Sequence, residues 1–140
     1  MQKFLLICFF AFTSSLAVFA HEGHDHGSGQ VQPTKGGVIQ KAGNIYYEVV
    51  GSKEDIKVYP MKESGPEAKT LKAVSLNEVK ISATYKLPRG KAAMPITFNK
   101  MNDHFAGKVS AQGAHRYQID LKVESGTLKD EIIYQIEPQE

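Results

Sequence analysis

Three of the five histidines in this 140-residue chain lie within six residues, in the segment HEGHDHG that begins at His21. Imidazole nitrogens bind copper, zinc, nickel and cobalt ions, and the carboxylates of Glu22 and Asp25 add oxygen donors between the histidines. Ligands two or three residues apart on one segment raise one another's effective concentration at a shared ion. The segment therefore predicts a transition-metal site formed by His21, His24, His26, Glu22 and Asp25. The alternative is a solvated polar linker whose histidines bind nothing.

The first twenty residues predict a secretory signal peptide. Lys3 precedes an apolar run from Phe4 to Phe12, and small residues lead to a cleavage position after Ala20 or, alternatively, after Ala17. The run is shorter than the roughly 20 apolar residues that a membrane-spanning helix needs, and no later stretch reaches that length. We therefore expect a periplasmic or secreted protein whose mature chain does not span a membrane.

Cleavage after Ala20 would leave His21 with a free α-amine beside its imidazole, so that one residue offers two nitrogen ligands. This N-terminal histidine brace is used by some copper-binding and copper-oxidising proteins. Oxidative catalysis needs rigidly held ligands, which a mobile segment does not supply. We therefore expect a metal-binding protein and no enzyme.

The composition excludes several other classes. Residues 1–20 contain Lys3 and the one cysteine, Cys8, but none of the 15 acidic residues, so the remaining chain has a formal net charge of +1. So small a charge argues against nucleic-acid binding, which needs a concentrated basic face. A mature chain without cysteine also has no disulfide, no Cys-based zinc site and no thiol nucleophile.

Two segments follow the signal peptide. Residues 21–35 contain one large apolar side chain, Val31, and predict a flexible His-rich tail, because they cannot bury enough apolar surface to offset the entropy of ordering. Residues 36–140 alternate short apolar stretches with Gly, Pro and Asn turns and predict one β domain.

The strand pattern of this domain predicts its architecture. Strands at 79–87 and 117–123 alternate apolar with polar residues, hairpins are expected at 38–50 and 96–110, and the total is roughly eight strands. Pro60 is expected to end a strand before an exposed loop at 62–69. We therefore expect an all-β fold, a single small immunoglobulin-like β-sandwich, with a small closed barrel as the alternative.

The two other histidines lie in the β domain. His115 shares the alternation of the strand at 117–123, so it is expected at the rim of the buried face, and His104 is expected to be exposed at a turn. A second interpretation joins His104 to Met94 and Met101 in a copper(I) site, because thioether and imidazole ligands favour that ion. Methionines more often fill gaps in a core.

The segments HEGHDHG and PTKGGVIQKAGNIYYEVV, followed by DIKVYPM, FNKMNDHFAGKVS and HRYQIDLKV, resemble a known domain. It is the small N-terminal β domain of heavy-metal efflux periplasmic adaptors of the cobalt-zinc-cadmium type, which also occurs in stand-alone periplasmic proteins. Gly36, Gly37 and Glu48 match the turn and the acidic residue of that pattern, whereas Lys35 and Tyr47 stand where it often has histidine. The 140 residues contain no counterpart of the adaptor's coiled hairpin and barrel. The resemblance therefore implies an accessory metal-binding module.

Two functions follow as expectations. The first is a periplasmic metal-binding accessory protein that buffers or hands over a divalent or copper-type ion through the tail. Its expected partner is a metal-efflux system. The second is a periplasmic β-sandwich interaction module with no metal role. The sequence leaves the metal open, since copper binds most tightly to almost any such set of ligands.

Overall fold

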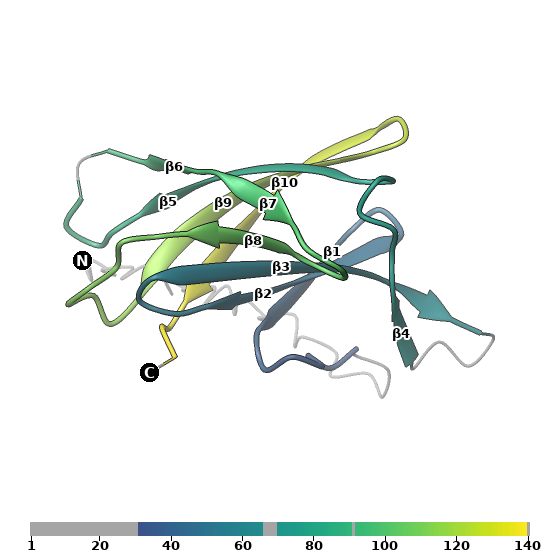
Figure 1. The fold of residues 1–140 in the computed structure, drawn as a ribbon, viewed down its shortest axis with the longest axis horizontal. Coiled ribbons are helices and arrows are strands. Elements are labelled where there is room, and N and C mark those ends of the chain that lie inside the picture. Colours follow the sequence, from purple (N-terminus) through teal and green to yellow (C-terminus); the bar gives the residue numbers. More distant parts are fainter. Residues whose placement is uncertain (1–30, 66–69, 91, 140) are drawn as a thin grey trace, which may run out of the picture.

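Two antiparallel sheets pack face to face in the computed structural model, which describes residues 31–65, 70–90 and 92–139 (Figure 1). The first sheet has the order β1-β2-β3-β8-β7, and β4 also pairs with β3; the second has the order β10-β9-β5-β6. The strands of the first sheet are β1 (Val38–Ala42), β2 (Ile45–Gly51), β3 (Asp55–Ser64), β4 (Thr70–Ala73), β7 (Phe98–Lys100) and β8 (Phe105–Lys108). Those of the second are β5 (Lys80–Lys86), β6 (Met94–Ile96), β9 (Tyr117–Ser125) and β10 (Leu128–Ile136). The predicted all-β sandwich is confirmed.

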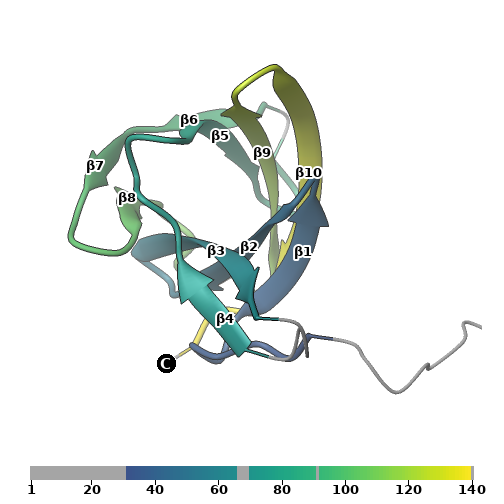
Figure 2. The same ribbon diagram turned by 90° about the vertical axis from the view of Figure 1, so that its right-hand side faces the viewer.

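The core lies between the sheets, where alternating side chains of both point inward. In β9 the residues at 117, 119, 121 and 123 are each at most 1% exposed, while their neighbours reach solvent, as the alternation predicts. Figure 2 shows β2 and β3 as one layer, β5 and β9 as the other, and β1 beside β10 at one edge. None of the described residues forms a helix long and apolar enough to cross a membrane.

Tyrosine hydroxyls of the second sheet bind backbone groups on the first-sheet side of the core. Tyr134 donates a hydrogen bond of 2.8 Å to the carbonyl oxygen of Tyr47, and Tyr117 donates one of 2.9 Å to that of Ser52. Burial raises the pKa of Tyr47 and of Tyr117 to about 12, because ionisation would place a charge in the core. These bonds fix how the two layers lie on each other.

The sequence predicts that Pro60 ends a strand. Pro60 instead lies within β3, opposite Tyr47. On its other edge β3 pairs with β8 up to Val58 and with β4 from Met61 onward. The carbonyl oxygen of Pro60 accepts a hydrogen bond from Val74 on that edge, so the missing N–H also falls there, where neither strand needs a donor. Proline is tolerated at this gap, and part of the expected loop is strand.

The first strand of the hairpin expected at 96–110 is also wrong, because the chain changes sheet within it. Met94–Ile96 forms β6 beside β5 in the second sheet, and Phe98–Lys100 forms β7 beside β8 in the first. The predicted hairpin survives as β7 and β8, joined by the turn at 101–104.

Candidate functional site

Glu48 is a fully buried carboxylate on the outer face of the first sheet, the face turned away from the second. It lies between Tyr47 and Val49, which point into the core, so alternation directs its side chain outward. There the strap, residues 34–37, crosses over it and excludes water. An unpaired buried carboxylate would be strongly unfavourable, so its partners decide whether this arrangement is stable.

The strap supplies those partners as four hydrogen bonds. Oε2 accepts from the amide of Thr34 at 2.8 Å and from its hydroxyl at 3.1 Å; Oε1 accepts from the amides of Lys35 at 2.7 Å and Gly37 at 3.0 Å. The Thr34 hydroxyl also lies 3.7 Å from the sulfur of Met61. Because every acceptor position faces a donor, Glu48 holds the N-terminal segment on the sheet and is not free to bind a metal ion.

The two glycines of the strap are required by its geometry. Gly36 adopts a φ of +78°, which other residues rarely do, and a Cβ on Gly37 would collide with the carbonyl oxygen of Val49. The chain is thus already bound to the domain at Thr34, two residues before the boundary predicted at residue 36.

Tyr59 extends this surface from Glu48 toward the turn at 101–104. Tyr59 is the cross-strand partner of Glu48. The ring of His104 packs against the ring of Tyr59, with centroids 4.8 Å apart and planes at 34°. His104 Nδ1 lies 2.8 Å from Asp103 Oδ1. His104 is therefore not exposed at a turn as expected: its side chain is 17% exposed and held between a carboxylate and a ring.

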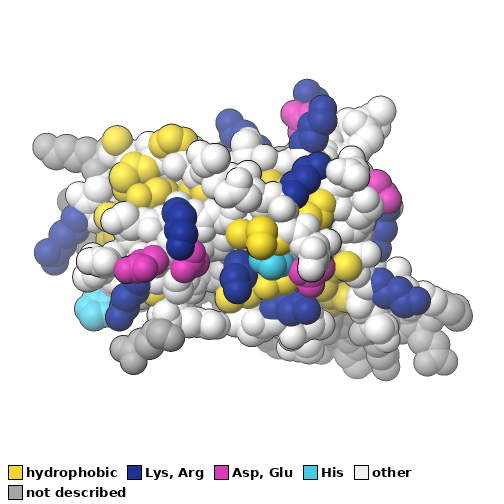
Figure 3. All heavy atoms as spheres, viewed as in Figure 1, with side chains coloured by type: hydrophobic (Ala, Val, Ile, Leu, Met, Phe, Trp, Pro, Cys, Tyr) yellow, Lys and Arg dark blue, Asp and Glu magenta, His cyan; other side chains and the backbone are white. Residues whose placement is uncertain are grey.

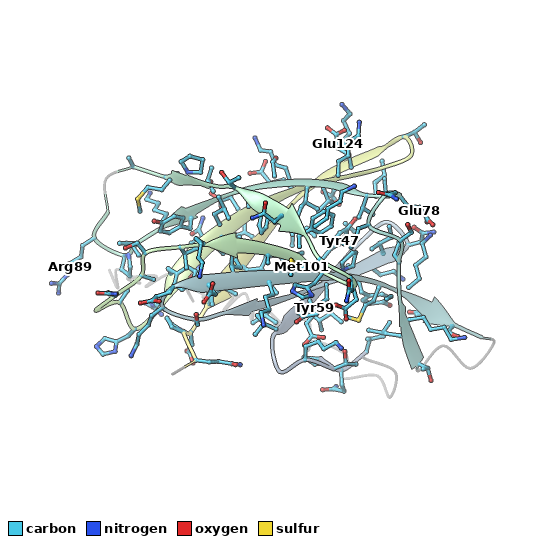
Figure 4. The ribbon with its side chains drawn as sticks, in the orientation of Figure 1. Tyr47, Tyr59, Glu78, Arg89, Met101 and Glu124 are labelled. Atoms are coloured by element: carbon cyan, nitrogen blue, oxygen red, sulfur yellow. The ribbon has the colours of Figure 1, made fainter. Side chains whose placement is uncertain are left out.

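The charges around Tyr59 alternate in sign. The Lys35 ammonium lies 3.9 Å from Asp103 and 5.3 Å from the centroid of Tyr59. The hydrogen bond with His104 lowers the pKa of Asp103, and partial burial followed by the charges of Asp103 and Glu48 raises that of Tyr59. Figure 4 places Tyr59 and Met101 in the middle of this face, and Figure 3 shows a histidine there among acidic, basic and hydrophobic atoms. We call Tyr59, Asp103 and His104 the histidine platform.

A second feature is a hollow of about 480 Å³ at the end of the sandwich where Figure 4 labels Arg89. The loop after β5 and the loop before β9 line it, and among the described residues no side-chain bond or ion pair forms to Arg89, His115 or Arg116. His115 is exposed and lies outside β9, so its expected place at the buried rim is wrong. The hollow is lined by Leu87, Pro88, Arg89, Gln112, Gly113, Ala114, His115 and Arg116.

The predicted ligands His21, Glu22, His24, Asp25 and His26 lie outside the described residues. Among the residues that are described, no three His, Cys, Asp or Glu side chains gather in a way that could hold a metal ion.

The second interpretation, a copper(I) site of two methionines and His104, is only half assembled. Met101 is 53% exposed in the turn that holds His104, and its amide donates to the carbonyl oxygen of His104 at 2.9 Å. Met94 is in β6 of the other sheet, and Figure 1 shows the length of β7 between the two places. The structure therefore separates Met94 from the other two residues.

The structural role of Glu48 was not predicted, although the sequence carries a signal for it. An acidic residue inside the apolar stretch IYYEVV needs either solvent or partners, and the adjacent segment PTKGG supplies a hydroxyl and flexible backbone amides.

No protein-family model and no curated protein matches the chain. Among solved structures, it is similar to the crystal structure of a DUF4426 family protein from Pseudomonas aeruginosa PAO1, with 18% sequence identity and a TM-score of 0.49. The similarity covers 77% of this chain and 100% of that one. By its own two sheets the chain is a small β-sandwich, with its N-terminal segment bound to a buried glutamate.

Proposed function

We propose that this chain is a periplasmic accessory protein that binds a transition-metal ion through His21, His24 and His26, assisted by Glu22 and Asp25. It would buffer or hand over copper, zinc, nickel or cobalt, with a metal-efflux or resistance system as the partner. The observation that carries the proposal is the density of ligands: three imidazoles and two carboxylates within six residues. Binding and transfer of the ion require no catalytic step.

The Glu48 bonds support this role because they tether the ligands to the domain. Eight residue steps separate His26 from Thr34 and thirteen separate His21 from it, so the chain allows at most about 27 Å for His26 and about 45 Å for His21. A metal ion bound by these residues would stay tethered to the domain, so that a partner could meet both the ion and the protein.

A metal titration of the exported protein, expressed with residues 1–20, tests the proposal. Copper(II) and zinc affinities are measured by competition with a chromophoric chelator, for the wild type and for a variant with His21, His24 and His26 replaced by alanine. The matched control is His115→Ala, which removes an exposed histidine at the hollow. We expect the triple variant to lose at least about tenfold in affinity, since multidentate binding is lost, and the control to stay unchanged.

The alternative is a β-sandwich interaction module with no metal role. The hollow favours it, because Arg89 and Arg116 there are free of carboxylate partners among the described residues and fit an acidic group of a partner. A triple variant that binds both ions as tightly as the wild type would refute the metal proposal and leave this alternative.

A further inference from the structure

Met101 and His104 are opposite residues at the turn between β7 and β8. The last paired residues of this hairpin are Lys100 and Phe105, so Met101 and His104 follow as the next pair. The amide of Met101 donates to the carbonyl oxygen of His104 at 2.9 Å, which joins the two residues across the turn. Directly opposed residues of an antiparallel hairpin project their side chains to the same face, with Cβ atoms about 5 Å apart.

That face is the outer face of the first sheet. Phe105 points into the core, so alternation turns its neighbour His104 outward, where the ring packs on Tyr59 at 4.8 Å. Met101 is 53% exposed, and Figure 4 places it with Tyr59 in the middle of this face. The turn therefore carries a thioether and an imidazole on one accessible surface.

The ring of His104 is oriented as in many metal sites. A ligating imidazole commonly donates its second ring N–H to a carboxylate, which fixes the tautomer and the ring orientation. Here Nδ1 lies 2.8 Å from Asp103 Oδ1, so this carboxylate can accept its hydrogen and leave the lone pair on Nε2. No described residue bonds to Nε2, and Nε2 is not among the buried polar atoms without a partner, so it reaches solvent.

We propose that Nε2 of His104 and the sulfur of Met101 bind a copper(I) ion. Thioether and imidazole ligands favour this soft ion, which accepts low coordination numbers, so the pair does not need Met94 from the other sheet. Asp103 is a positioning residue, since it orients the ring and does not touch the ion. The site goes beyond the proposed function, because it uses residues of the folded domain alone and none of residues 21–26.

Lys35 gives this site an independent test. Its ammonium lies 3.9 Å from Asp103 and 5.3 Å from the centroid of Tyr59, so a cation at His104 meets a positive charge nearby. The backbone amide of Lys35 makes the bond to Glu48, and its side chain is 44% exposed, so Lys35→Gln removes the charge and keeps the strap. We expect Lys35→Gln to tighten copper(I) binding several-fold, because the repulsion is removed.

The methionine methyl groups give a test that needs no variant. Outside residues 1–20 the chain has three methionines, Met61, Met94 and Met101. Their methyl signals are followed by NMR in the exported wild-type protein during addition of silver(I), a soft ion of the same charge, and of copper(I) under anaerobic reducing conditions. At substoichiometric metal we expect the Met101 signal to shift with either ion and the other two to stay. Zinc should move none of them, because a thioether is a poor ligand for it.

Affinities then identify the ligands. Copper(I) binding is measured by competition with a chromophoric chelator in the triple tail variant, so that the tail histidines do not contribute. In this parent, Met101→Leu and His104→Phe should each lower the affinity at least about tenfold, since each leaves a single ligand. The matched controls Met94→Leu and His115→Ala should leave it unchanged. Asp103→Ala should weaken binding several-fold and alter the ring nitrogen signals of His104 in the metal-free protein, which report the tautomer.

The outcomes separate this inference from the proposed function. If the Met101 methyl signal stays in place, or if Met101→Leu binds copper(I) as tightly as its parent, the inference is overturned. If Met101→Leu weakens binding and His104→Phe does not, the pair is refuted as well; near-ultraviolet circular dichroism checks that both variants fold. The proposed function is decided by the copper(II) and zinc affinities of the triple variant, which do not depend on Met101.

Discussion

Replacing Glu48 with glutamine tests whether the buried carboxylate holds the N-terminal segment. The substitution keeps the size of the side chain but gives it one acceptor oxygen and one NH₂ group. With its NH₂ group toward Thr34, the glutamine keeps the hydrogen bonds from the amides of Lys35 and Gly37, and the Thr34 hydroxyl can turn to accept from the NH₂ group. The amide of Thr34 then loses its acceptor, and the three bonds that remain no longer involve a charged group.

The magnitude follows from the lost bond and from the loss of the charge. A hydrogen bond to a charged group contributes about 1.5–3 kcal/mol and a neutral one about 0.5–1.5 kcal/mol, so the one lost bond and the three weakened ones together cost about 3–6 kcal/mol before compensation. A neutral amide is easier to bury than a carboxylate, which returns part of this free energy. We expect the free energy of unfolding to fall by about 3 kcal/mol, which lowers Tm by roughly 10 to 15 °C for a domain of about 100 residues.

The matched control is Glu131→Gln, the same chemical change on the exposed side of β10. It should stay within about 0.5 kcal/mol of the wild type. Thermal unfolding by circular dichroism gives Tm, and hydrogen exchange at the amides of Thr34, Lys35 and Gly37 reports the strap. Equal Tm values for the two variants, with protection retained at these amides, would refute the role we assign to Glu48.

Three other predictions concern stability. Gly37→Ala should lower the free energy of unfolding by about 1–3 kcal/mol, since the new Cβ meets the carbonyl oxygen of Val49; an unchanged urea midpoint would contradict this. Tyr47→Phe should be neutral or stabilising, because the Tyr47 hydroxyl is buried without a partner among the described residues. Tyr134→Phe should lower the free energy of unfolding by about 1–2 kcal/mol, because it removes the bond to the Tyr47 carbonyl oxygen. Urea unfolding that ranks the two variants in the reverse order would contradict the core geometry. Alkaline pH should destabilise the domain, because burial raises the pKa of Tyr47 and Tyr117 to about 12. The contribution of these tyrosines to stability is complete below about pH 10, and it is lost toward pH 12 because they ionise first in the unfolded state. The loss in the free energy of unfolding is about 2–3 kcal/mol per tyrosine. Urea midpoints measured between pH 9 and about 12 check that trend, and a flat profile would refute it.

The regular strands of the sandwich are predictable because their signal is local. Alternation in 79–87 and 117–123 follows directly from one face being buried, and β5 and β9 confirm it. The change of sheet between Ile96 and Phe98 leaves no such signal, because apolar residues continue to alternate across it. Pro60 is tolerated for a reason equally distant in sequence, a gap between β8 and β4 on one edge of β3.

The candidate site shows the same division. The ligand-rich segment at 21–26 can be identified from residue types alone, but the burial of Glu48 depends on a strap that begins 14 residues before it. The sequence around His104 indicates a turn, and its support by Tyr59 comes from a strand that pairs with β8. Such cross-strand neighbours carry no marker in the sequence of either segment.

The geometry also explains why a site at the positions where efflux-adaptor domains often carry histidine would not form here. Lys35 lies on the outer face, whereas Tyr47 points into the core and its side chain is fully buried. Adjacent residues of a strand face opposite ways, so a ligand at 47 and a ligand at 35 would have the sheet between them. Glu48 is on the correct face, but its oxygens already accept four hydrogen bonds.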